Sequence, residues 1–221
     1  MRAFGYYVVK PLPAPGWCGL GAESILSVSE NGLSEKFPDL ERCFYINKPR
    51  KLREEYRRYL GLDEKGFNDF CGMTAQLFDS RRLTTDMRFR SAEDAFALCA
   101  LVHLQEYKVV GIYTDDEIFA EYEREGTFDL IGTAEDTSRP KRLLGCDILG
   151  CEALDAGYFC FDTYIINSLY EVITEQGGNL ITDRHTALIQ NPYNETKEFC
   201  GMIQGQGEPV IWTPFEVYEI E

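Results

Sequence analysis

The chain has 221 residues, of which 44% are hydrophobic and 13% aromatic, and its formal net charge is −15. This composition is typical of a globular protein with a packed core and argues against a disordered chain. The sequence contains no apolar run long enough for a transmembrane helix or for the core of a signal peptide, so we expect a cytoplasmic protein that does not bind membranes.

Hydrophobic periodicity in the first half predicts two strands followed by helices. β-Branched and aromatic residues predict a strand over 4–10, which the proline-rich segment PLPAPG ends. A second strand is expected over 24–30. Apolar residues at helical spacing predict a helix over 48–62 and another over 64–78. A further helix is expected to begin at Ser91, where a capping-box pattern occurs.

The pattern continues in the second half with a strand over 108–114 and a helix over 115–125. The polar stretch 133–142 contains a proline, and we expect a loop there, which is also the best candidate for an internal boundary. Neither half has an obvious complete core of its own. We therefore expect a single α+β domain over residues 1–221, with helices packed on a mixed or antiparallel sheet.

Residues 143–169 contain three cysteines, three aspartates and a glutamate, which could indicate a reactive site. The apolar alternation predicts a strand with three side chains on one face: Leu144, Cys146 and Ile148. Residues 157–163 predict a second strand. Asp162 is the predicted N-cap of a helix over 163–176. We therefore interpret this segment as strand, strand and helix, in which each residue has a structural role.

The C-terminal segment GEPVIWTPFEVYEIE predicts a strand that contains prolines. Pro209 and Pro214 cannot donate a hydrogen bond to a ladder, so we expect an edge strand or a break at Pro214. Trp212 could pack in the core, or it could lie on an exposed edge that binds a partner. The usual burial of large aromatic side chains favours the core.

The excess negative charge lies entirely in the second half of the chain. Residues 1–105 carry 15 basic and 14 acidic side chains, whereas residues 106–221 carry 7 and 23. Such a charge repels nucleic acid and attracts a basic protein, although it could also serve only as a solvated face. The candidate contact residues come from one acidic run: Asp115, Asp116, Glu117, Glu121, Glu123 and Glu125.

Cysteine and histidine residues offer the alternative of a thiol- or metal-dependent hydrolase. Cys99 and His103 are four residues apart on a predicted helix, a spacing that could supply two metal ligands or simply a core thiol beside a terminal imidazole. Cys160 or Cys200 could act as a nucleophile with His185 as the base. No CxxC pair, phosphate-binding loop or catalytic signature is present, so we expect no metal and no cofactor.

Several blocks of the second half, LLGCDILG, GYFCFDTYIINSL, NLI and EPVIWTPFEVYEI, occur in an ordered series. They resemble a group of bacterial proteins of unassigned activity, in which a GFEVLG-like strand is followed by FHSWLCNSL and a terminal EPxLWxPW. In this chain Asp162 stands where the group often has histidine, and Tyr164 and Phe215 each replace a tryptophan. The resemblance implies an immunity-protein-like or antitoxin-like function and assigns no reaction. We therefore expect a binding protein that masks a basic partner such as a toxin.

Overall fold

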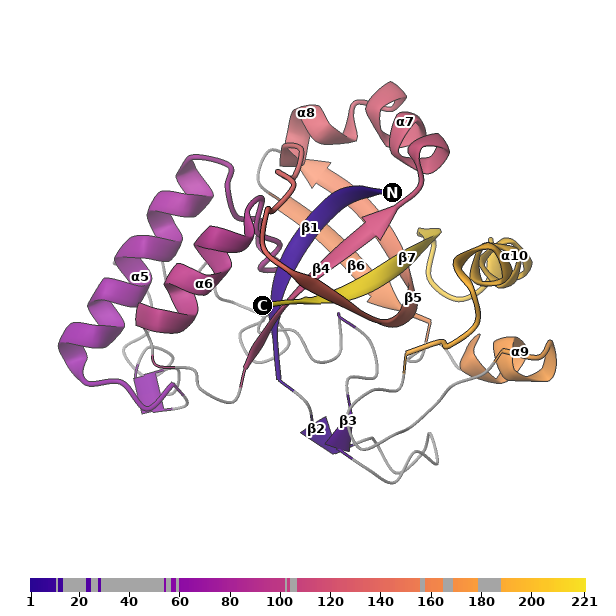
Figure 1. Cartoon of the computed structure of the whole chain (residues 1–221). Helices are drawn as coiled ribbons and strands as arrows, with labels where there is room; N and C mark the ends of the chain where they lie inside the picture. Colours follow the sequence, from indigo (N-terminus) through magenta and orange to yellow (C-terminus); the bar gives the residue numbers. More distant parts are fainter. Residues whose placement is uncertain are drawn as a thin grey trace.

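The computed structural model describes residues 1–10, 12–13, 23–24, 28, 54, 57–58, 60–101, 103, 107–155, 158–164, 169–178 and 188–221. These residues form an antiparallel sheet with helices packed around it (Figure 1). The expected α+β class is thereby confirmed.

The main sheet has five strands in the order β1 (Arg2–Val9), β4 (Lys108–Thr114), β7 (Ile211–Ile220), β5 (Lys141–Asp155) and β6 (Tyr158–Thr163). Every neighbouring pair is antiparallel. Two short strands, β2 (Leu12–Pro13) and β3 (Glu23–Ser24), form a separate pair. The last strand in the sequence, β7, therefore lies at the centre of the main sheet, between β4 and β5.

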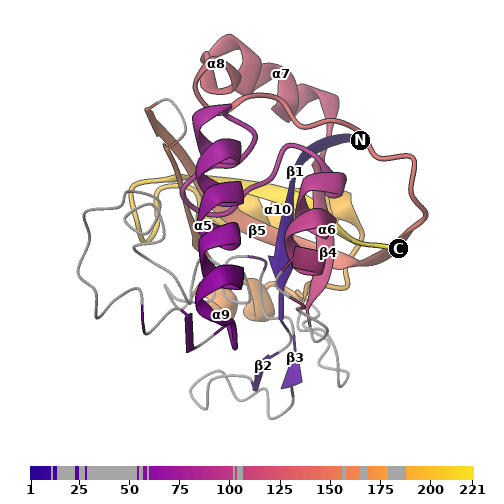
Figure 2. The same ribbon diagram turned by 90° about the vertical axis from the view of Figure 1, so that its left-hand side faces the viewer.

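The described helices are α5 (Glu64–Asp79), α6 (Ala92–Leu101), α7 (Asp116–Arg124), α8 (Thr127–Ile131), α9 (Leu169–Glu175) and α10 (Tyr193–Ile203). Figure 1 shows three groups around the sheet, with α5 and α6 on one flank, α7 and α8 above, and α9 and α10 on the other flank. The view in Figure 2 places α5 and α6 in front of β1 and β4. Within the described residues, no helix has the length and apolarity needed to cross a membrane.

Each helix group has its own buried cluster against the sheet. The cluster beneath α5 and α6 includes Phe70, Leu98 and Tyr6. The second contains Phe119 of α7 and Phe128 of α8, packed with residues of β1, β4, β5 and β7. The third gathers the buried side chains of α9 and α10 around β5 and the first part of β7. One central sheet thus serves as the shared wall of three apolar cores.

The helix predicted over 64–78 and the strand predicted over 108–114 are confirmed. The capping pattern at Ser91 is confirmed as well, because the backbone N–H of Asp94 donates to Ser91 Oγ at 3.2 Å. The strand predicted over 24–30 and the helix over 48–62 lie largely outside the described residues.

The polar stretch 133–142 runs from α8 into β5 and is tied to the first half of the chain. The backbone N–H of Glu135 donates to the carbonyl of Arg90 at 2.8 Å. The hydroxyl of Tyr6 donates to the carbonyl of Glu135 at 2.7 Å. This stretch therefore lies against β1 and the segment that precedes α6.

Two predictions for the segment 143–169 are wrong. The register of β5 shifts between Leu143 and Gly145, so Leu144 packs in the cluster of α7 whereas Cys146 and Ile148 pack in that of α10. A bulge interrupts strict alternation in this way. Asp162 and Thr163 both belong to β6, so the helix predicted to begin at residue 163 does not begin there.

The position predicted for the C-terminal strand is also wrong, because β7 is central and continues through Pro214. The alternative that places Trp212 in the core is confirmed, since its side chain is only 1% exposed.

Candidate partner-binding groove

The candidate site begins where β7 loses one of its two neighbours. β5 pairs with the whole length of β7, from Ile211 to Ile220. β4 pairs with β7 only between Glu216 and Glu219 and ends at Thr114. The chain then turns away into α7. The first residues of β7 therefore have a strand on one side only, and on the other side they face the space between α7 and α10.

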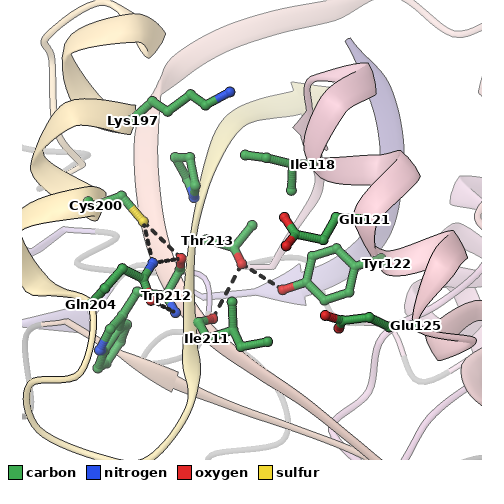
Figure 3. Close-up of a pocket in the computed structure, with 12 residues that line it drawn as sticks. Ile118, Glu121, Tyr122, Glu125, Lys197, Cys200, Gln204, Ile211, Trp212 and Thr213 are labelled. Carbon is green, nitrogen blue, oxygen red and sulfur yellow. Dashed lines mark hydrogen bonds between the residues drawn. The ribbon is translucent and has the colours of Figure 1, made fainter.

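That space is a groove with a cavity of about 430 Å³ (Figure 3). We call it the α7–α10 groove, and it is lined by Ile118, Glu121, Tyr122, Glu125, Lys197, Cys200, Gly201, Gln204, Ile211, Trp212, Thr213 and Pro214. Helical periodicity explains one wall, since the four α7 residues are spaced as i, i+3, i+4 and i+7 and share a face. The first residues of β7 form the floor.

Side chains from α10 replace the missing strand at Trp212. The amide of Gln204 accepts from the backbone N–H of Trp212 at 3.3 Å and donates to its carbonyl. The thiol of Cys200 donates to the same carbonyl at 2.9 Å. An unpaired strand edge offers backbone groups to any passing strand, so these bonds protect the edge of β7.

On the side of β7 that faces away from β5, Pro214 is bonded to side chains and not to a neighbouring strand backbone. Its carbonyl accepts from Thr114 Oγ1 at 3.1 Å and from the Tyr193 hydroxyl at 3.5 Å. Because N–H and C=O of one strand residue point to the same side, the missing donor of Pro214 faces the side on which the β4 ladder has already ended. The proline therefore removes no ladder hydrogen bond, which is why it is tolerated in a central strand.

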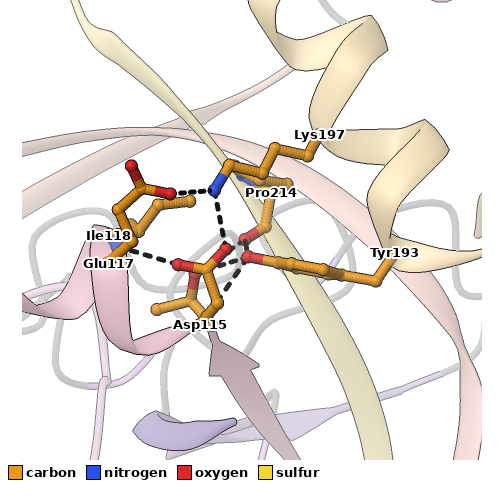
Figure 4. A network of polar contacts seen from close by, with 7 residues as sticks. Asp115, Glu117, Ile118, Tyr193, Lys197 and Pro214 are labelled. Atoms are coloured by element: carbon orange, nitrogen blue, oxygen red, sulfur yellow. Dashed lines mark hydrogen bonds and ion pairs between the residues drawn. The ribbon is translucent and has the colours of Figure 1, made fainter.

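One end of the groove is closed by an ion-pair bridge between α10 and α7 (Figure 4). Lys197 Nζ lies 2.8 Å from Asp115 Oδ2 and 2.8 Å from Glu117 Oε2. Asp115 is also the N-cap of α7, because its Oδ1 accepts from the backbone N–H of Ile118 at 2.8 Å. The hydroxyl of Tyr193 accepts from the backbone N–H of Asp115 at 3.2 Å. We call this the Lys197 bridge.

The charges of this bridge stabilise one another. Partial burial raises the pKa of Asp115, but the hydrogen bonds from Ile118 and Lys197 outweigh it, so its pKa lies below the ordinary value. Hydrogen bonds to Asp115 and Glu117 raise the pKa of Lys197 above its ordinary value. Asp115 and Lys197 are therefore both charged at neutral pH.

The side chains of the six acids predicted as contact residues point in several directions, because they lie on different faces of α7. Asp115 and Glu117 belong to the Lys197 bridge. Glu123 points toward the N-terminal strand, where its Oε1 lies 3.5 Å from the guanidinium of Arg2. Asp116 is exposed in the first turn of α7.

Glu121 and Glu125 are the two members of that set that line the groove. Both are exposed, and no ion pair to either occurs among the described residues. They are four residues apart, which places two like charges side by side on one helix face and slightly destabilises the helix.

A second cavity of about 320 Å³ adjoins the groove and shares three lining residues with it, Tyr122, Glu125 and Ile211. It is also lined by Glu152, an exposed acid of β5. The groove therefore continues from α7 across the start of β7 toward β5, and a third acid lies along its path.

The groove also contains groups that are held neutral. The hydroxyls of Tyr122 and Thr213 lie 2.6 Å apart, and burial raises the pKa of Tyr122 far above its ordinary value. Burial likewise raises the pKa of the Cys200 thiol to about 12. A nucleophilic cysteine needs the opposite shift, so this environment favours a hydrogen-bonding role for Cys200.

Cys99 and His103 are brought to the wall of a different cavity, of about 460 Å³, beside Glu219. Burial raises the pKa of the Cys99 thiol to about 11. Among the described residues, no group of three histidine, cysteine or acidic side chains could hold a metal ion. His185 and the side chain of Cys160 lie outside the described residues, so the hydrolase alternative stays a prediction for that pair.

Of the half of the groove that comes from α10 and β7, the sequence analysis named Cys200, as a possible nucleophile, and Trp212, as a possible partner-binding edge, and it missed the other residues. Lys197, Tyr193 and Gln204 acquire their roles through contacts with residues far away in the sequence. One local signal was present, because Lys197 is the only lysine or arginine after position 184. A single base in so acidic a segment indicates an internal ion pair.

Comparison with protein-family models, with curated proteins and with solved structures finds no match to this chain. The resemblance to immunity-like bacterial proteins therefore stays a prediction.

Proposed function

We propose that this protein is an acidic binding protein that masks a basic protein partner, in the manner of an immunity protein or antitoxin, and that it does so through the α7–α10 groove. The observation that carries the proposal is the pair Glu121 and Glu125. Both line an open groove beside exposed apolar surface, and neither has a basic partner among the described residues.

Charge and apolar area act together in such a site. The floor includes Ile211, which is 49% exposed although it begins a central strand. Covering apolar surface supplies affinity, whereas complementary charge speeds association and selects the partner. The net charge of the second half adds long-range attraction for a basic protein, and this attraction weakens as salt is added.

The test is a pull-down from the native host with a charge-reversed double variant, Glu121→Lys/Glu125→Lys. The matched control is Glu175→Lys/Glu198→Lys, which makes the same change in net charge at exposed helical positions outside the groove. We expect the parent and the control to recover the same basic protein, identified by mass spectrometry and released by high salt. The groove variant is expected to lose it.

Two results would count against the proposal. Recovery of the same partner by the groove variant and the parent would remove Glu121 and Glu125 from the interface. Equal loss in both double variants would show that total charge, and not this groove, governs binding.

A further inference from the structure

We propose that the α7–α10 groove receives an extended segment of its partner, in which basic side chains alternate with apolar ones. This inference rests on the proposed function and specifies the chemistry and the conformation of the bound segment. It draws on the size of the groove, on the spacing of its acids and on the exposed apolar floor between them.

The extent of the site favours an extended chain over a helix. The main cavity of about 430 Å³ and the adjoining cavity of about 320 Å³ share Tyr122, Glu125 and Ile211, so together they form one continuous path. An α-helix with its side chains is about 10 Å across. An extended segment is thinner, and it can continue from the main cavity into the one that Glu152 lines.

The spacing of the acids matches an extended chain. Glu121 and Glu125 are separated by four residues of helix, a rise of about 6 Å. Alternate side chains of a strand lie on the same face about 6.6 Å apart. Two basic residues at positions i and i+2 of a bound segment can therefore each reach one carboxylate, while the residue between them points the other way.

The floor of the groove is suited to that intervening residue. Ile211 and Pro214 of β7 line the groove beside the two glutamates of the α7 wall. Figure 3 shows the side chains of Glu121 and Glu125 on the α7 side and Ile211 on the strand beneath. An apolar side chain placed there removes exposed Ile211 from water.

An acidic segment is disfavoured by the same geometry. Lys197 is the base among the residues that line the groove, and its ammonium is already engaged by Asp115 and Glu117. A ligand carboxylate would therefore meet two glutamates that have no basic partner in the described part of the chain, and a lysine whose charge is compensated. A direct strand addition to β7 is also disfavoured, because Gln204 already occupies the backbone groups of Trp212.

Fluorescence anisotropy with labelled peptides tests this inference. The probe is a peptide of alternating lysine and valine, about ten residues or roughly 33 Å long when extended. Two peptides of the same composition serve as comparisons, one with the lysines and valines in separate blocks and one with the residues arranged for an amphipathic helix. We expect the alternating peptide to bind at least about tenfold more tightly than either comparison.

Variants locate the binding. We expect Glu121→Gln/Glu125→Gln to weaken binding of the alternating peptide about tenfold or more, and Ile211→Ser to weaken it as well. Glu175→Gln/Glu198→Gln is the control and is expected to bind like the parent. Circular dichroism of each variant checks that the fold is retained.

Equal or tighter binding of the block or helical peptide would overturn the inference, as would an unchanged affinity in the groove variant. These failures can be told apart from failure of the proposed function. If the charge-reversed variant loses the natural partner but the alternating peptide shows no preference, the partner binds as a folded surface and only the extended-segment inference falls. If the natural partner is retained by that variant, both fall.

Discussion

The two halves of β7 have the same conformation but different surroundings. From Glu216 to Glu219 the strand lies between β4 and β5, and its backbone groups are used by the two ladders. From Ile211 to Pro214 it has β5 on one side and the α7–α10 groove on the other. The second half is therefore a purely structural part of the sheet, whereas the first half combines a core strand with a surface that can bind.

This difference shows how a fold can open a site without exposing a strand edge. Ending β4 at Thr114 frees one side of β7, and a free edge is a hazard for aggregation. Gln204, Cys200 and Tyr193 satisfy the backbone groups on that side from another element. The side chains above the edge are then available for a partner, while the backbone is not.

The largest effect in this comparison is expected from Trp212→Ala. The side chain of Trp212 is buried against α10, and its Nε1 donates to the carbonyl of Gln206 at 2.9 Å. Removing it should lower the free energy of unfolding by about 3–5 kcal/mol because a large cavity is left. Urea denaturation measures this value.

The matched control is Ile211→Ala, one residue away but half exposed, which should change stability by less than about 1 kcal/mol. A Trp212→Ala variant with the urea midpoint of the parent would contradict the description of this half of β7 as a core strand.

A smaller effect is expected when the side chain of Gln204, which takes the place of β4 beside Trp212, is removed. Gln204→Ala leaves the backbone N–H of Trp212 without its acceptor, and the unfolding free energy should fall by about 1–2 kcal/mol. Hydrogen exchange should become faster at the Trp212 amide and stay unchanged at Val217. Gln206→Ala, which removes only an exposed side-chain bond to Met202, is the control. If the Trp212 amide exchanged equally slowly in both variants, Gln204 would not be the residue that stabilises this edge of β7.

The smallest effect is expected from the Lys197 bridge. Lys197→Met should cost under about 1 kcal/mol, because the ions are partly exposed and screened by solvent. The folded pKa of Asp115 is lowered and that of Lys197 is raised, so the bridge contributes above the ordinary Asp pKa of 3.8 and below the ordinary Lys pKa of 10.5. The contribution is lost as pH falls through the folded pKa of Asp115.

Urea midpoints of the parent and of Lys197→Met should therefore differ by the same amount at pH 7 and at pH 5, and the difference should shrink below pH 3.8. A difference that grows on acidification would rule out this ion pair as the source of the stabilisation.

The predictions that depend on residues close together in the sequence were confirmed most often. The helix at 64–78, the strand at 108–114 and the cap at Ser91 follow from spacings of a few residues, and the structure confirms them. The prediction at Leu144 failed because a bulge changes which side chain faces which core, and a bulge depends on the partner strand.

Only part of the candidate site could be predicted from the sequence. Charge counting found the acidic residues of α7, since net charge is a property of the sequence alone. It could not tell Glu121 and Glu125 from Glu123 or Glu117, which differ only in the bases that the fold brings near them. The other wall of the groove comes from α10, about 80 residues later, and no local pattern links the two helices.

The sequence by itself determined the α+β class, the strongly periodic elements and the negative charge of the second half, because each depends on residue type and short-range spacing. Tertiary structure alone decided that the last strand is central, that Pro214 is harmless there and that Glu121 and Glu125 lie beside an apolar floor with no basic partner among the residues that the structure describes. The physical reason is that strand order, ion pairing and cavities arise from contacts between residues far apart in the chain, and the sequence does not state which distant residues meet.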